Sequence, residues 1–106
     1  MSASRRAERT TGPRHYVVAY DISDDRRRDK VFTLLQGFGD HAQYSVFFCE
    51  LNEEELVRLR RRTRALIHHG EDQVMIVELG RAVRPLESAL EVLGRPYEPV
   101  VRSVVV

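Results

Sequence analysis

The chain has 106 residues, of which 42% are hydrophobic and 31% charged, with a formal net charge of +1. This length suits one domain with one modest core, and no apolar run approaches the roughly 20 residues that cross a bilayer, which excludes a membrane protein. The single cysteine, Cys49, excludes an internal disulfide and a multi-cysteine zinc site, and because no apolar stretch typical of a secretory signal follows the first arginines, we expect a cytoplasmic protein.

The first third of the chain predicts an extension, a strand and a helix. Residues 1–14 are polar without a hydrophobic period, which indicates a flexible N-terminal extension. Residues 16–20 form a short apolar run of β-branched and aromatic side chains, typical of a central strand, which stops at Asp21. Asp24 can cap the helix that follows, where apolar residues at helical spacing predict a helix over residues 25–36.

The next segment predicts a strand with two unlike faces. Residues 43–51 alternate and are rich in aromatic side chains, and a short stub at 40–42 could precede them. Ser45, Phe47 and Cys49 share one face of this strand. We expect that half-polar face to meet a partner or a ligand.

A second helix and a third clear strand follow. Asn52 and Glu55 have the spacing of a capping box, and an apolar stripe at helical spacing extends from there to about His69. Residues 73–79 are rich in β-branched and other apolar side chains and predict a strand. The order of elements predicts an α+β domain over residues 15–106, with one sheet and both helices on one face.

The C-terminal part is less regular. Residues 85–94 could form a short helix, and two prolines then break it. The last residues, 100–106, have high β-propensity and need a sheet edge to pair with. We therefore predict a homodimer in which this terminal strand joins the sheet of the second subunit.

Asp21 is the first candidate for chemistry. An aspartate at the end of a buried strand, just before a helix, can present its carboxylate to a ligand. The alternative is a structural aspartate that accepts hydrogen bonds from the next turn. A twofold axis near Asp21 would give a pair of carboxylates, which with water and phosphate oxygens suits Mg²⁺.

Two basic clusters are candidates for binding nucleic acid. Sixteen of the 17 basic residues are arginine, because Lys30 is the only lysine, and guanidinium groups suit phosphate. The codon bias of a GC-rich genome would explain the high number of arginines equally well. Only their positions can therefore indicate whether they bind phosphate. The first cluster lies at the start of the first helix, where cations oppose the helix dipole and call for an anionic partner. Its members are Arg26, Arg27, Arg28 and Lys30.

The partner of this cluster could be phosphate, or it could be the acids beside it, Asp24, Asp25 and Asp29. In the second helix, Arg58, Arg61 and Arg62 lie on one face at helical spacing. They predict either a sequence-independent track for a nucleic-acid backbone, which weakens with salt, or a solvated helix that complements its own dipole.

Other enzyme classes lack their signatures. No nucleophile with a base, no phosphate-binding loop and no dinucleotide-binding glycine pattern is present. His68 and His69 are adjacent on a helix and point in different directions, so they do not predict a metal pair.

Taken together, these motifs resemble those of Cas2, the small CRISPR-associated protein family of spacer acquisition. An aspartate that ends the first strand, followed by Gln-x-Ser-Val-Phe, is the most specific part of the match, which runs from about residue 15 to the C-terminus. The matching residues are 20–25, Arg28, Lys30, Phe38, Gly39, 43–47, Glu50 and Leu51. The resemblance implies a ferredoxin-like βαββαβ homodimer in which Asp21 of both subunits shares one magnesium ion.

The resemblance also implies metal-dependent endonuclease activity on RNA or DNA, and a role in joining integrase dimers around a new spacer. The residues that match the family's active-site positions are Tyr20, Asp21, Arg28, Lys30, Ser45 and Phe47. His41 stands where some relatives have arginine. Residues 1–14 lie outside the family pattern.

Two functional hypotheses follow. In the first, Asp21 and its mate hold Mg²⁺ for phosphodiester cleavage, and Arg28 or Lys30 steadies the developing charge. In the second, the dimer is a non-catalytic adaptor that binds duplex DNA through its arginine helices and docks the CRISPR integrase. A ferredoxin-like sensor of small molecules is disfavoured because no glycine-rich ligand loop is visible.

Overall fold

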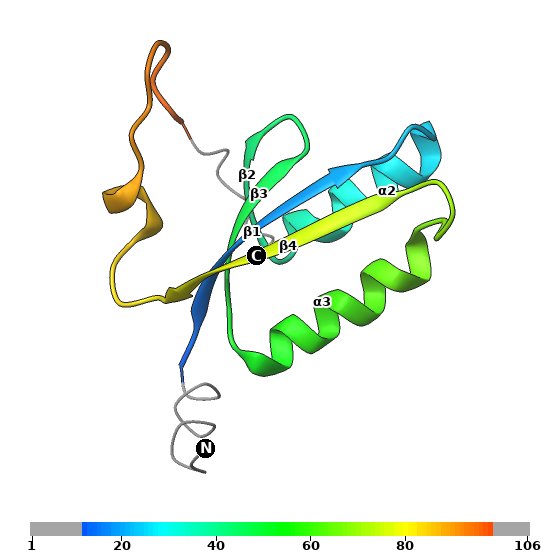
Figure 1. Ribbon diagram of the computed structural model, residues 1–106, viewed down its shortest axis with the longest axis horizontal. Helices are drawn as coiled ribbons and strands as arrows, with labels where there is room; N and C mark the ends of the chain where they lie inside the picture. The colour runs from blue at the N-terminus through cyan, green and yellow to red at the C-terminus, as the bar shows by residue number, and fades with distance from the viewer. Residues whose placement is uncertain (1–11, 99–106) are drawn as a thin grey trace, which may run out of the picture.

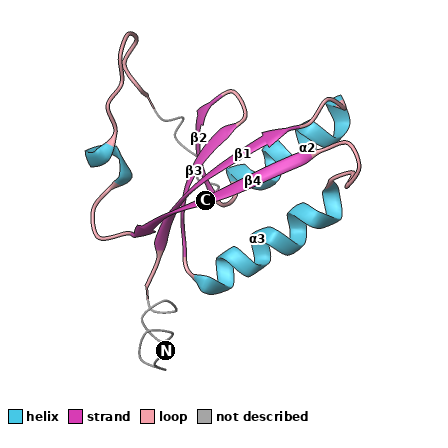
Figure 2. Cartoon of the chain, viewed as in Figure 1, coloured by secondary structure: helices cyan, strands magenta, loops and turns pink. Residues whose placement is uncertain are grey.

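The fold is a four-stranded antiparallel sheet covered on one face by two helices (Figure 1, Figure 2). The structure is a computed structural model and describes residues 12–98. The strand order is β2-β3-β1-β4. The elements are β1 (Arg14–Asp21), α2 (Asp25–Gln36), β2 (Gly39–Gln43), β3 (Val46–Leu51), α3 (Glu53–Leu66), β4 (Gln73–Arg81) and the 3₁₀ helix η1 (Leu86–Ala89).

This arrangement confirms the predicted α+β, ferredoxin-like βαββαβ class. β1 begins at Arg14, the last residue of the predicted extension. Residues 1–11 and the predicted terminal strand over 100–106 lie outside the described residues. No helix between residues 12 and 98 has the length and apolar character needed to cross a membrane.

Local signals at the helix starts behave as predicted. The carboxylate of Asp24 accepts a hydrogen bond from the Arg27 backbone N–H at 2.9 Å, and α2 has the predicted bounds. Asn52 and Glu55 form the predicted capping box at the start of α3, with both hydrogen bonds at 2.8 Å. The predicted end of this helix near His69 was wrong, because the backbone is already extended at Ile67.

The predicted continuous strand over 43–51 was wrong at its start. The chain turns at Tyr44 and Ser45, and the suggested stub before it is the full strand β2. Tyr44 adopts a positive φ of 38° and is almost fully exposed. Gly39 lets β2 approach β3, because a Cβ at this position would collide with the Phe48 carbonyl and the Cys49 sulfur.

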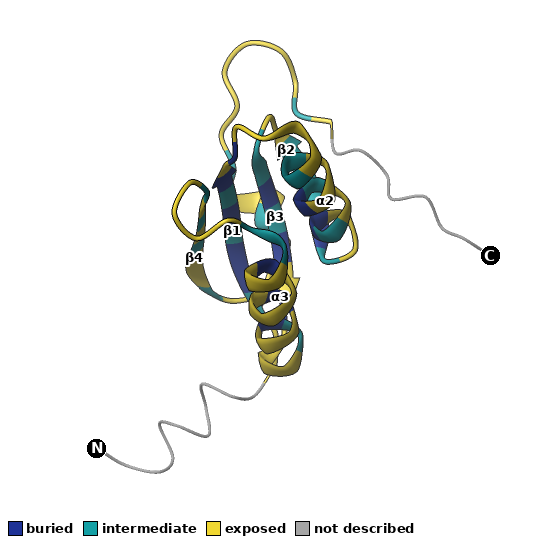
Figure 3. Ribbon diagram, turned by 90° about the vertical axis from the view of Figure 1, so that its right-hand side faces the viewer, coloured by how far each residue is buried: buried dark blue, intermediate teal, exposed yellow. Residues whose placement is uncertain are grey.

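The core lies between the sheet and the two helices, as the buried residues in Figure 3 show. The expectation that the Ser45, Phe47 and Cys49 face meets a partner was wrong for the two strand residues, because Phe47 and Cys49 are buried beneath the helices. Strand alternation identifies two faces but does not say which one the helices cover. The core side chains are Tyr16, Val18, Tyr20, Ile22, Val31, Leu35, Phe47, Cys49, Leu51, Leu56 and Leu59.

The other face of the sheet is not covered by α2 or α3 (Figure 3), and the 3₁₀ helix η1 and the residues after it lie along one end of it, near Val17, Val46 and Phe48. We call it the open face; its central members, by strand alternation and register, are Val17, Ala19, Asp21, Val46, Phe48, Gln73, Met75 and Val77. The predicted helix over 85–94 is reduced to η1. The residues after η1 return to one end of the open face, where the ring of Tyr97 lies 5.9 Å from that of Phe48.

Candidate metal and nucleic-acid site

Asp21 lies at the end of β1 with its side chain exposed on the open face. Its neighbour Ile22 is buried in the core, so the backbone beside the carboxylate is anchored while the carboxylate itself is accessible. Within residues 12–98, no group of three or more His, Cys, Asp or Glu side chains could hold a metal ion. Asp21 therefore offers a single carboxylate, and a complete Mg²⁺ site at this position would need donors from outside the described residues.

Tyr20 lies on the opposite side of β1 from Asp21. Its ring is buried, 6.4 Å from that of Phe47, and burial raises the pKa of its hydroxyl above the ordinary value of 10.0. The hydroxyl therefore stays protonated at neutral pH. Ser45 lies in the turn before β3, where its carbonyl accepts a hydrogen bond from the Tyr20 N–H at 3.1 Å.

These three residues thus support the strand that carries Asp21, and their side chains do not converge on its carboxylate. Phe47 is fully buried and also contacts Phe32, with ring centroids 5.4 Å apart. Such packing fixes the end of β1 in place.

Arg28 is bound to the loop that follows Asp21. Its Nη1 donates hydrogen bonds to the carbonyls of Ile22 and Ser23 at 3.1 and 3.2 Å, and its Nη2 pairs with the carboxylate of Asp25. The side chain is still partly exposed, so its guanidinium is a fixed cation on the loop that follows Asp21. Lys30 is exposed on α2, with no ion pair or hydrogen bond of its side chain within the described residues.

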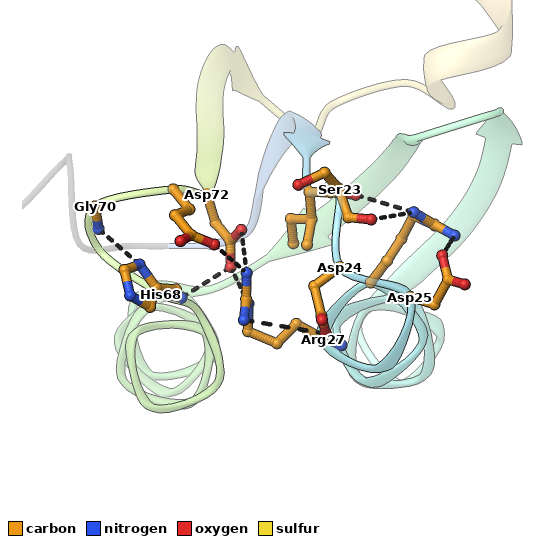
Figure 4. A network of polar contacts seen from close by, with 10 residues as sticks. Ser23, Asp24, Asp25, Arg27, His68, Gly70 and Asp72 are labelled. Atoms are coloured by element: carbon orange, nitrogen blue, oxygen red, sulfur yellow. Dashed lines mark hydrogen bonds and ion pairs between the residues drawn. The ribbon is translucent and has the colours of Figure 1, made fainter.

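The side chain of Arg27 is bound to the loop before β4, as Figure 4 shows. Its Nε donates to Asp72 Oδ2 at 2.7 Å, and its Nη2 donates to Asp72 Oδ1 at 3.2 Å and Glu71 Oε1 at 3.1 Å. The hydrogen bonds between Arg27 and Asp72 raise the pKa of the guanidinium and lower that of the carboxyl. Arg28 thus has one of the acidic partners considered from sequence, Asp25. The guanidinium of Arg27 is bound mainly by Asp72 and Glu71, which were not among them.

Sequence reasoning missed Asp72. It comes directly after the turn that follows α3 and directly before β4, a position typical of an acid that binds a nearby backbone. Its bond to the His68 N–H, at 2.8 Å, fits that signal. Its second partner, Arg27, is 45 residues away in the chain and has no local signal.

The remaining predicted arginines are exposed. Arg58, Arg61 and Arg62 lie on the outer side of α3, and Arg26 lies on α2. Within the range 12–98 none of these four guanidinium groups makes an ion pair or a hydrogen bond. The acids in the first turn of α3 do not neutralise them, so the helical layer offers free cations to an anionic ligand.

The fold and site define a class: a small ferredoxin-like domain with an exposed carboxylate, Asp21, at one end of its open face, and with arginines on its helical layer that have no internal partner among the described residues. The family model of CRISPR associated protein Cas2 matches residues 14–84. The chain belongs to the Cas2 family, as the resemblance indicated.

Relatives of known name support this membership over most of the chain. A "CRISPR-associated endoribonuclease Cas2" of Geobacter sulfurreducens is 34% identical over 93 residues, which cover 86% of this chain and 95% of the relative. A "CRISPR-associated endonuclease Cas2 2" of Thermus thermophilus is 44% identical over 93 residues, which cover 88% and 96%.

Solved structures share the fold. A hypothetical protein, TT1823, from Thermus thermophilus superimposes with a TM-score of 0.70 at 44% identity, covering 84% of this chain and all of that one. Cas2 of Streptococcus pyogenes, in a crystal structure at pH 6.5, gives a TM-score of 0.65 at 26% identity, covering 76% and 99%.

Proposed function

We propose that the protein is a magnesium-dependent endonuclease of CRISPR adaptation, acting on RNA or DNA as a homodimer in the cytoplasm. The observation that carries this proposal is the position of Asp21 on the open face, among apolar side chains that a second copy would cover. The names of the relatives above support a nuclease activity.

The open face supports the dimer because it exposes apolar surface. Met75 and Val77 are exposed at 53% and 47%, with Val17 and Val46 half-buried beside them. Burying such surface stabilises association by roughly 25 cal/mol per Å². In a twofold interface the same surface patch is used by both copies, so Asp21 of one copy would approach Asp21 of the second if the axis passes close to this residue.

A pair of Asp21 carboxylates would fit Mg²⁺ by the chemistry of its donors, because Mg²⁺ prefers oxygen ligands and is commonly held by one or two carboxylates together with water and phosphate oxygens. Bound there, the ion would supply Lewis-acid chemistry to a phosphate and a water molecule. Arg28 is held on the loop after Asp21 by the Ile22 and Ser23 carbonyls, and in this proposal it would stabilise negative charge on the phosphate. Tyr20, which is buried and protonated, positions the strand.

The β4 edge supports the predicted use of the chain's end. β4 is an outer strand of the sheet, so its outer side can pair with another strand. Residues 100–106 of a second copy have the β-propensity for that role.

The alternative function is a non-catalytic adaptor that binds DNA and bridges integrase dimers. The free arginines of α3 favour it, because they suit a nucleic-acid backbone without a role in cleavage. In this alternative Asp21 is dispensable for binding.

The test compares wild type with Asp21→Asn for cleavage of single-stranded RNA and duplex DNA, in Mg²⁺ and in EDTA. We expect Asp21→Asn and EDTA to abolish cleavage, because each removes the metal or its ligand. Asp29→Asn is the matched control: it removes an exposed carboxylate of the same charge on α2 and should cut like wild type. Equal cleavage by wild type and Asp21→Asn contradicts the metal site; binding of duplex DNA by both without cleavage supports the adaptor.

A further inference from the structure

Asp21 is held in the sheet from one side. The register between β1 and β3 ends at Ala19 and Val46, whereas the register between β1 and β4 continues to Asp21 and Gln73. In the described part of the chain, the backbone of Asp21 therefore has its strand partner in β4 alone. The buried side chains of Tyr20 and Ile22 hold the backbone before and after Asp21, and its position also depends on how firmly its strand partner, the first residue of β4, is held.

The anchor of that residue is its neighbour, Asp72. The Asp72 side chain has no exposed surface and binds Arg27 through both carboxylate oxygens. It also accepts the His68 N–H at 2.8 Å, while its own N–H donates to the His68 carbonyl at 2.8 Å. Two-point bonds between a guanidinium and a carboxylate are strong and directional, so the start of β4 is tied to the first turn of α2.

Arg27 is held equally firmly at its other end. Its backbone N–H donates to the capping carboxylate of Asp24. Its side chain is 25% exposed, and the guanidinium also donates a hydrogen bond to Glu71. The side chain reaches from α2 to the loop before β4 (Figure 4). Residues 21–24 are thereby enclosed between two fixed segments, the first turn of α2 and the start of β4.

We propose that Arg27 and Asp72 are a positioning pair for Asp21. The pair touches neither substrate nor metal; it ties the first turn of α2, which follows the Asp21 loop, to the start of β4, which pairs with Asp21, so that the carboxylate is already in place when a divalent cation binds. Without the pair, the start of the edge strand β4 would fray more readily, and Asp21 would lose its strand partner. The cation would then have to order Asp21 when it binds, which lowers its affinity. This inference rests on the proposed function, because it assigns the pair to the metal position.

The test measures Mn²⁺ affinity of the full-length protein by electron paramagnetic resonance, and amide hydrogen exchange over residues 20–24 by mass spectrometry. Asp72→Asn keeps the shape of the side chain and removes its charge, and Arg27→Lys keeps the charge and removes the two-point geometry. We expect each variant to bind Mn²⁺ about tenfold or more weakly, the loss typical of residues that orient a metal ligand, and to exchange faster over residues 20–24.

Two matched controls separate this effect from a general loss of charge. Asp29→Asn and Arg60→Lys alter exposed residues of α2 and α3 and should leave Mn²⁺ affinity and exchange unchanged. If Asp72→Asn fails to fold, the Mn²⁺ affinity and amide exchange of Arg27→Lys test the proposal. A folded variant with wild-type Mn²⁺ affinity overturns the proposal.

The result is distinguishable from a failure of the proposed function. If wild type and Asp21→Asn both bind no Mn²⁺, the metal site fails. In that case the amide exchange rates alone test whether the pair positions Asp21. Rates over residues 20–24 that equal those of wild type in both Asp72→Asn and Arg27→Lys overturn the proposal.

Discussion

Two aspartates at the same end of the sheet have opposite environments. Asp21, at the end of β1, is exposed, whereas Asp72, just before the strand partner of Asp21, has no exposed surface and three hydrogen-bond donors around it. An exposed carboxylate can take a ligand, while a buried one must be paired within the protein. Residue type alone does not separate these roles; the surroundings do.

The paired state of Asp72 predicts how stability depends on pH. Its pKa is lowered from the ordinary value of 3.8, chiefly by the hydrogen bond from Arg27. The folded state therefore binds this proton less readily than the unfolded state, so the stabilisation is present above pH 3.8 and is lost as the pH falls below it. In urea unfolding at a series of pH values, Asp72→Asn should be less stable than wild type at pH 7 and should lose less stability on acidification.

Asp29→Asn provides the comparison for this experiment, because it removes a carboxylate that is exposed. It should keep the pH dependence of wild type. An Asp72→Asn protein with the same pH dependence as wild type would contradict the assignment.

At the scale of the element, α3 combines a buried stripe with an exposed row of arginines. Leu56, Leu59 and Thr63 face the core, so the arginines between them are directed outward by the helical period. None of Arg58, Arg61 and Arg62 has an internal partner among the described residues. The helix is thus suited to bind phosphate without rearrangement.

Replacing Arg58, Arg61 and Arg62 together with Gln should weaken binding to duplex DNA and reduce its salt dependence. Removing one arginine that binds a phosphate lowers the slope of log affinity against log salt by about 0.9. The measurement is a fluorescence anisotropy titration at several salt concentrations.

A charge-matched control is the triple replacement of Arg81, Arg84 and Arg95 by Gln, which removes three exposed arginines outside the helices. It should retain a steeper slope than the α3 variant. Equal slopes of log affinity against log salt for the two variants would show that the arginines of α3 are not a preferred binding surface for DNA.

At the scale of the whole molecule, the two faces of the sheet have different partners. The helices cover one face, and the open face keeps apolar side chains on β4 together with Asp21. A single chain supplies one Asp21 there and, within residues 12–98, no group of three or more His, Cys, Asp or Glu side chains that could hold a metal ion. The proposed activity is therefore a property of two chains.

Val77→Glu should convert the dimer to a monomer and abolish Mn²⁺ binding, because it places a charge in the apolar interface and separates the two Asp21 carboxylates. Val57→Glu is the control: Val57 is equally exposed, 50% against 47%, but lies on α3. Light scattering after size exclusion measures the mass. A monomeric wild type, or a Val77→Glu protein that remains dimeric, contradicts the open-face interface.

The sequence by itself determined the features that depend on neighbours in the chain. The bounds of α2, the Asn52 capping box and the strand ending at Asp21 all follow from local hydrogen bonds and short-range hydrophobic periods. The motif of Asp21 with residues 43–47 was specific enough to indicate the family. The turn at Tyr44 was missed because residues 43–47 contain no glycine, proline or asparagine to mark it.

Only the tertiary structure decided which sheet face is the core and which arginines are free. Alternation in β3 is the same whichever face the helices cover, so Phe47 could be assigned only when α2 and α3 were in place. Arg27 and Arg28 had the pattern of cations available to phosphate until the fold brought Asp72 and the carbonyls of the loop against them. Contacts between distant segments arise from the packing of the whole chain, and a local pattern of residues does not contain them.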